Sequence, residues 1–113
     1  MIPITPETVR ATYTYLLSFP PFNRWRLPPA KKLTFYVTDF TGEWAEYNHE
    51  KHTLRVSTVN VATYDALIRV VAHELIHVRE HVAGKWTVKH DSAFFKESKR
   101  MILKHFAFDP LTF

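Results

Sequence analysis

The sequence predicts an α+β fold in which helices pack on one face of a small sheet. Two observations lead to this expectation. Residues 64–82 repeat apolar side chains at intervals of three and four, as a buried helical face does. Residues 33–57 instead contain three short segments rich in β-forming residues and separated by turns. The expected order is helix, three strands, helix and helix, within one domain that spans residues 1–113.

The first 30 residues predict one helix and one ordered loop. Thr5, Pro6 and Glu7 form a helix start, with a capping side chain, a proline at the first helical position and an acid in the first turn. We expect this helix to end before Pro20. Its apolar stripe consists of Val9, Tyr13, Leu16 and Leu17. Residues 22–30 carry aromatic side chains, so we expect them to form a loop packed on the domain.

Three segments are expected to form the sheet: Leu33–Thr38, Glu43–Tyr47 and Thr53–Ser57. Gly42 marks the turn after the first segment, and the polar residues 48–52 form the tip of a hairpin. Because the strands are short and consecutive, the expected pairing is a three-stranded antiparallel meander.

Two helices are expected to follow the sheet. Thr63 is a plausible N-cap for the first of them, and Gly84 supplies the backbone freedom that a helix end commonly uses. Its buried face comprises Tyr64, Leu67, Ile68, Val71, Leu75, Val78 and Val82. At about 100° per residue, the histidines of residues 73–77 project from the opposite side. The last helix is expected to begin with Asp91 or Ser92 as its N-cap.

Residues 73–77 have the sequence His-Glu-x-x-His. Positions i and i+4 lie one turn apart on the same side of a helix, so the imidazoles of His73 and His77 can hold one metal ion together. Glu74 would face a water bound to that ion, and this combination suits zinc-assisted hydrolysis. The chain has no cysteine, so the ligands must be histidine or carboxylate. The sequence therefore predicts one Zn²⁺ per chain, with Glu74 as the general base.

A catalytic zinc site usually has a third protein ligand. His81, His90, Glu97 and His105 all follow the motif. His81 lies one turn further along the same helix, too far for three rings to meet one ion. His105 falls on the apolar stripe of the last helix, where a hydrogen-bonded core histidine is expected, and Glu97 lies near its basic side. His90 is preferred, with Glu97 as the alternative, because the chain can reverse just before it and return over the metal.

These residues resemble the SprT-like (Spartan-type) zinc metallopeptidase domain. That family has His-Glu-x-x-His, a variable connection and then His-Gly-x-x-Phe at the start of a helix. Here the motif is followed by His90, Asp91 and the pair Phe94–Phe95, and the resemblance extends over about residues 33–106. Asp91 departs from the usual glycine, and the cysteine-rich zinc ribbon of many members has no counterpart in the sequence. The resemblance implies a small zincin-like fold and a zinc metalloendopeptidase whose metal ligands are His73, His77 and His90.

Three features of the mechanism remain open in the sequence. Tyr47, Tyr64 and His81 are all candidates to stabilise the oxyanion of the reaction. A protein or peptide substrate could bind as an added strand at a free sheet edge, and Thr53–Ser57 is the preferred strand for this. Members of the family act on proteins crosslinked to DNA, but a peptidase that cuts one particular partner fits the sequence equally well.

The net charge and the lengths of the apolar runs indicate which partners and which cellular location to expect. The net charge of +4 and the pI of about 9.5 permit nucleic-acid binding without requiring it. No apolar run approaches the roughly 18 residues that a membrane span needs, and no signal peptide is recognised. We therefore expect a cytoplasmic protein with no membrane contact, and the oligomeric state stays open. The alternatives to a peptidase are a zinc-binding module without proteolytic activity and a basic nucleic-acid-interaction module.

Overall fold

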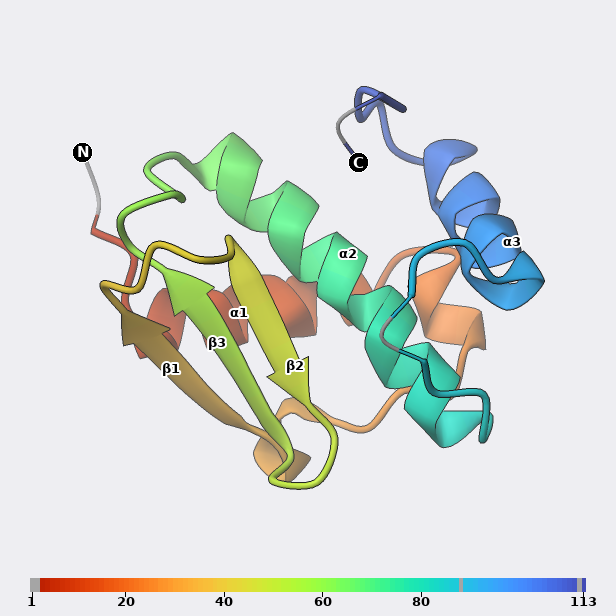
Figure 1. Cartoon of the computed structure of the whole chain (residues 1–113), viewed down its shortest axis with the longest axis horizontal. Helices are drawn as coiled ribbons and strands as arrows, with labels where there is room; N and C mark the ends of the chain where they lie inside the picture. Colours follow the sequence, from red (N-terminus) through yellow and green to blue (C-terminus); the bar gives the residue numbers. More distant parts are fainter. Residues whose placement is uncertain (1–2, 88, 112) are drawn as a thin grey trace.

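The computed structural model describes residues 3–87, 89–111 and 113. The elements confirm the predicted α+β class and the predicted order (Figure 1). In sequence, they are α1 (Pro6–Leu17), β1 (Thr34–Thr38), β2 (Ala45–Asn48), β3 (Thr53–Ser57), α2 (Tyr64–Val82) and α3 (Ala93–Leu103). Two short 3₁₀ helices, Phe22–Arg24 and Ala30–Lys32, lie in the loop before β1.

The sheet is mixed, so the predicted antiparallel meander was wrong. β3 lies between the other two strands and pairs antiparallel with β2 but parallel with β1. The connection at residues 39–44 crosses the end of β3 instead of turning back beside β1. Six residues can span two strand spacings, which together measure about 10 Å. Side chains at the end of β3 and just after it hold this crossing. Ser57 Oγ donates to the Phe40 carbonyl at 2.6 Å, and Asn60 Nδ2 donates to the Glu43 carbonyl at 3.1 Å.

One face of the sheet is apolar and forms part of the core. The strand register aligns buried side chains from all three strands in one row, namely Phe35, Leu54 and Tyr47. α1 covers this face, and the Tyr13 ring lies 5.5 Å from the Phe35 ring. The opposite face is polar, with an ion pair between Arg55 and Glu46 at 3.3 Å.

α2 is the central helix of the fold. It packs against α1, β2 and α3, and Figure 1 shows it running past the outer edge of β2. The predicted caps are present: the Thr63 side chain accepts from the Ala66 amide, and Gly84 has a φ of 70°. Of the predicted apolar face, Leu67, Val71, Leu75 and Val78 are fully buried and Ile68 is half-buried. Tyr64 and Val82, at the two ends of the helix, are exposed. α3 makes its main contacts with α2 and not with the sheet, which refines the expectation that all helices pack on the sheet.

The remaining helix ends agree with the sequence analysis. Thr5 caps α1 through a reciprocal pair of hydrogen bonds with Thr8, and Ser92, rather than Asp91, caps α3. The loop after α1 is packed on the body of the protein, with Phe22 and Trp25 buried. None of the helices in the described part of the chain has the length and apolar character needed to cross a membrane.

Candidate metal centre

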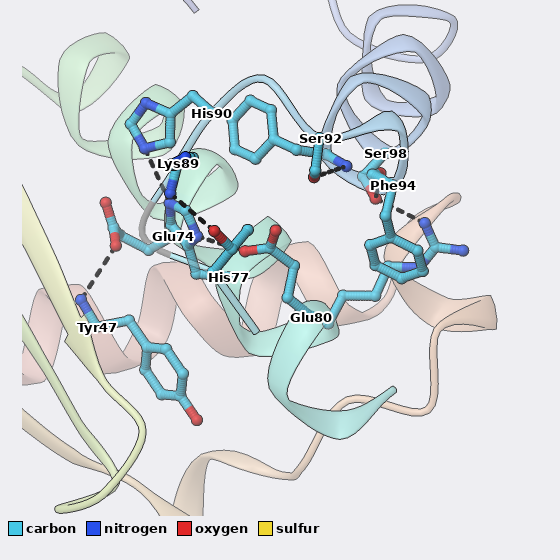
Figure 2. A network of polar contacts seen from close by, with 12 residues as sticks. Tyr47, Glu74, His77, Glu80, Lys89, His90, Ser92, Phe94 and Ser98 are labelled. Atoms are coloured by element: carbon cyan, nitrogen blue, oxygen red, sulfur yellow. Dashed lines mark hydrogen bonds and ion pairs between the residues drawn. The ribbon is translucent and has the colours of Figure 1, made fainter. Parts of the chain in front are cut away.

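The structure brings together the three histidines that the sequence proposed as ligands. His73 and His77 project from α2, and His90 comes from the connection between α2 and α3. Each ring offers one nitrogen, and these three nitrogens lie within 4.8 Å of one another. Figure 2 shows His77 with His90 on one side and Glu80 on the other.

The spacing of the ring nitrogens suits a tetrahedral metal ion. Nε2 of His77 and Nε2 of His90 are 3.2 Å apart. Two nitrogens bound to one tetrahedral zinc at about 2.05 Å would be about 3.3 Å apart. His77 and His90 therefore already have the separation that a shared ion requires. Three histidine ligands with a fourth position left for water are typical of a catalytic zinc site.

The protonation state of the rings also favours metal binding. Burial, together with the neighbouring His90, lowers the pKa of His73 to about 4. Burial and the adjacent histidines lower the pKa of His77 to about 3. Both rings are therefore neutral at neutral pH, which is the form that binds metal ions.

Glu80 fixes the orientation of the His77 ring. Its Oε1 lies 2.6 Å from His77 Nδ1, and its side chain is completely buried. Burial raises the pKa of the Glu80 carboxyl group to about 7. A ring that donates from Nδ1 must present the lone pair of Nε2 to the centre, so Glu80 selects the metal-binding tautomer. Glu80 was not among the residues predicted from the sequence, although a carboxylate three positions after a ligand histidine on a helix was the available signal.

The position of His90 is fixed by a contact with α3 on one side and by the chain reversal after α2 on the other. Its ring stacks on Phe95, with 4.9 Å between the ring centres and an angle of 19°. Phe95 is buried in the first turn of α3, and that helix is joined to α2 by a hydrogen bond from Arg79 Nη1 to Ser98 Oγ at 2.6 Å. The reversal after α2 uses the left-handed conformation of Gly84, as expected.

Glu74 lies beside the three histidines and contacts the sheet. Its Oε1 accepts a hydrogen bond from the Tyr47 amide at 3.0 Å (Figure 2). Burial raises the pKa of Glu74 to about 8; the Tyr47 hydrogen bond acts in the opposite direction, and the nearby Glu43 and Glu46 add to the rise. The carboxylate is thus positioned by a backbone donor of β2 and has a proton affinity close to that of a general base at neutral pH.

A cleft of about 710 Å³ opens in front of the centre. α2 and β2 form its two long walls, and Trp86, His90 and Phe113 close it. The Phe113 ring lies 6.1 Å from the His73 ring. Trp86 and Phe113 were not predicted to line the site, because neither belongs to a sequence motif.

The other candidate ligands lie elsewhere. Glu97 is exposed on α3 and lies 3.8 Å from Arg79. His105 is exposed beyond the end of α3, so the expectation of a core histidine was wrong. The helix ends at Leu103, and its apolar stripe therefore stops before this position.

The structure also shows which oxyanion candidate lies at the cleft and whether the proposed substrate strand has a free edge. Of the three candidates, Tyr47 lines the cleft; Tyr64 is exposed at the start of α2, and the His81 ring lies by His49 and His52. The strand Thr53–Ser57 is the central strand, so it has no free edge and the preference for it was wrong. The edge beside the cleft belongs to β2.

Comparison with known proteins supports the fold. No protein-family model and no curated protein sequence matches the chain. A solved structure does match: the crystal structure of the metallopeptidase zymogen jannalysin of Methanocaldococcus jannaschii. The TM-score is 0.55 with 15% sequence identity, over 91% of this chain and 83% of the other. The chain therefore has a metallopeptidase-like fold, with a cluster of three histidines that could hold a metal ion.

Proposed function

We propose that this protein is a zinc-dependent metallopeptidase of the SprT-like kind. The observation that carries the proposal is the convergence of three imidazoles, two of them on adjacent turns of α2, beside the buried carboxylate of Glu74. The order and spacing of His73, His77 and His90, followed by an aromatic residue in the next helix, support the SprT-like assignment. The fold shared with a metallopeptidase zymogen is consistent with it.

Each residue of the site has a separate role in the proposed peptide hydrolysis. His73, His77 and His90 would hold the ion, and Glu80 keeps His77 in the required tautomer. A zinc ion bound there would polarise a peptide carbonyl and lower the pKa of a coordinated water. Glu74 takes the proton from the attacking water and delivers it to the leaving amine. The Tyr47 amide fixes one oxygen of Glu74 and leaves the other available for this transfer.

The edge of β2 supports an extended protein or peptide substrate. The Ser57 amide donates to the Trp44 carbonyl, so residue 44 faces β3, whereas the Tyr47 amide points outward to Glu74. Because strand residues alternate in direction, the amide and the carbonyl of Ala45 also face outward. These groups line the cleft and could pair with the backbone of an added strand. Such pairing gives affinity with little dependence on side chains.

A peptide-library experiment tests this proposal. Zinc-loaded protein is incubated with a mixture of unstructured peptides, and new termini are identified by mass spectrometry. We expect cleavage by the wild type and none by Glu74→Gln, while both proteins retain one equivalent of zinc. Glu97→Gln is the matched control, because it removes an exposed carboxylate that lies outside the cleft. Retention of zinc without cleavage by the wild type would instead support a zinc-binding module without proteolytic activity.

A further inference from the structure

A second group of histidines lies outside the candidate metal centre. His49 and His52 are in the turn between β2 and β3, and His81 is in the last turn of α2. The His81 ring lies 5.3 Å from the His49 ring and 6.2 Å from the His52 ring, measured between ring centres. Figure 1 shows this hairpin and the end of α2 at the same end of the molecule. None of these three residues lines the cleft.

We propose that His49, His52 and His81 form a second, weaker binding site for a divalent transition metal. The proposal does not depend on peptidase activity. In the first centre, the ring centres are 4.9 to 5.4 Å apart. The pair His49–His81, at 5.3 Å, already has this spacing. His52 is about 1 Å further from His81, so it must move inward, and this accounts for the weaker binding. Three imidazole donors suit zinc, copper or nickel rather than magnesium or calcium.

The contacts around the turn between β2 and β3 favour this inward movement of His52. The Asn48 side chain accepts hydrogen bonds from the Glu50 and Lys51 amides, both at 3.0 Å, and so fixes the start of the turn. His49 packs on Trp86, with 4.4 Å between the ring centres, and is half-buried. His52 is exposed in a turn position, with a φ of 54°, where its side chain has room to move. One ligand is therefore held in place and another is free to approach.

Trp86 makes the second site measurable. Its ring lies between the two groups of histidines, 4.4 Å from His49 and 5.7 Å from His77. A paramagnetic ion such as Cu²⁺ at either group would quench its fluorescence. The test therefore uses a protein whose first centre has been removed by His73→Ala and His77→Ala together. In that background we expect one equivalent of Cu²⁺ to bind with quenching, and Trp86→Phe to abolish most of the quenching.

Substitutions within the second group identify the ligands. In the same background, His81→Ala and His49→Ala should each weaken Cu²⁺ binding at least tenfold, and His52→Ala should weaken it less. His105→Ala is the matched control, because this histidine is exposed in a surface pocket with Tyr15 and should leave binding unchanged. Absence of saturable quenching, or equal effects of His81→Ala and His105→Ala, would overturn the proposal.

A second measurement covers the case in which the doubly substituted protein does not fold. Wild-type protein that carries one equivalent of Zn²⁺ is titrated with further Zn²⁺ by calorimetry. We expect a second, weaker equivalent to bind to the wild type and to His105→Ala, but not to His81→Ala. If the wild type binds no second equivalent, or if His81→Ala still binds it, the second site does not exist.

Discussion

Replacing Glu74 by glutamine should stabilise the metal-free protein, and by an amount that grows with pH. The pKa of Glu74 is raised from 4.5 to about 8, mainly by burial. The folded protein therefore keeps this proton at pH values where the unfolded chain has lost it. The stability that the protonated group contributes is complete below about pH 4.5, and it is lost as the pH rises toward 8. Glutamine cannot ionise, so Glu74→Gln does not lose this stability as the pH rises.

The size of the effect follows from the two pKa values. Between 4.5 and 8, each pH unit costs the wild type about 1.4 kcal/mol relative to the variant. The slope is shallower close to each pKa, so from pH 5 to pH 8 the free energy of unfolding of Glu74→Gln should rise by about 3.5 kcal/mol relative to that of the wild type. The glutamine side chain of the variant can still accept the hydrogen bond of the Tyr47 amide, so the comparison isolates ionisation. The other titrating groups are common to both proteins and cancel in the difference.

Urea unfolding at pH 5, 6, 7 and 8 measures this difference. Both proteins are treated with a chelator, and unfolding is followed by circular dichroism. Glu97→Gln serves as the control, because its exposed side chain should change the free energy of unfolding by less than about 0.5 kcal/mol at every pH. A difference between wild type and Glu74→Gln that stays constant from pH 5 to pH 8 would refute the reasoning. When both proteins carry zinc, the difference in free energy of unfolding between them should depend less on pH, because a nearby cation favours the ionised form of Glu74.

Three further predictions concern the metal centre. One zinc ion per chain should bind to the high-affinity site, and His73→Ala should abolish this binding, as measured by metal analysis after dialysis. Glu80→Leu should weaken zinc binding by about 10- to 100-fold, because it removes the acceptor that orients the ligand ring, and a competitive chelator assay would detect this. Gly84→Val should weaken zinc binding less than His90→Ala does, because it only strains the loop that carries this ligand, whereas Glu97→Gln should leave it unchanged. Loss of zinc in Glu97→Gln with retention in His90→Ala would show that the third ligand is a carboxylate.

The parts of the site that the sequence predicted are those that depend on local periodicity. Helix geometry alone places His73 and His77 on adjacent turns, and the apolar spacing of α2 fixes which face is buried. His90 could be selected because a glycine and a helix cap restrict the path of a short connection. In each case the relevant information lies within about one helix length along the chain.

The parts that escaped prediction depend on contacts between distant residues. The order β1-β3-β2 is set by a crossing held by Ser57 and Asn60, and hydrophobic patterns do not encode such a pairing. That error also led to the choice of Thr53–Ser57 as the substrate strand. Likewise, the Tyr47 amide contacts Glu74 across 27 positions of sequence, and no pattern of residue types identifies a backbone donor.

The free edge of β2 allows the proposed mode of substrate binding to be tested separately from the chemistry. Ala45 is the first residue of this edge strand, and its amide points away from β3. Proline is tolerated at such positions, because the missing N–H takes no part in the sheet. If a peptide pairs with this edge, Ala45→Pro removes one hydrogen bond worth about 1 kcal/mol and should raise KM about fivefold.

This variant should keep a kcat and a zinc content close to those of the wild type. The backbone hydrogen bond to Glu74 comes from the amide of Tyr47 and not from that of Ala45. Glu46→Pro is the informative counterpart, since the amide of residue 46 faces β3 and its loss should destabilise the sheet itself. An unchanged KM in a folded, zinc-loaded Ala45→Pro protein would mean that substrates do not pair with residue 45. The catalytic proposal built on Glu74 would survive that result, because the hydrogen bond that holds this carboxylate comes from Tyr47, two residues further along the same edge.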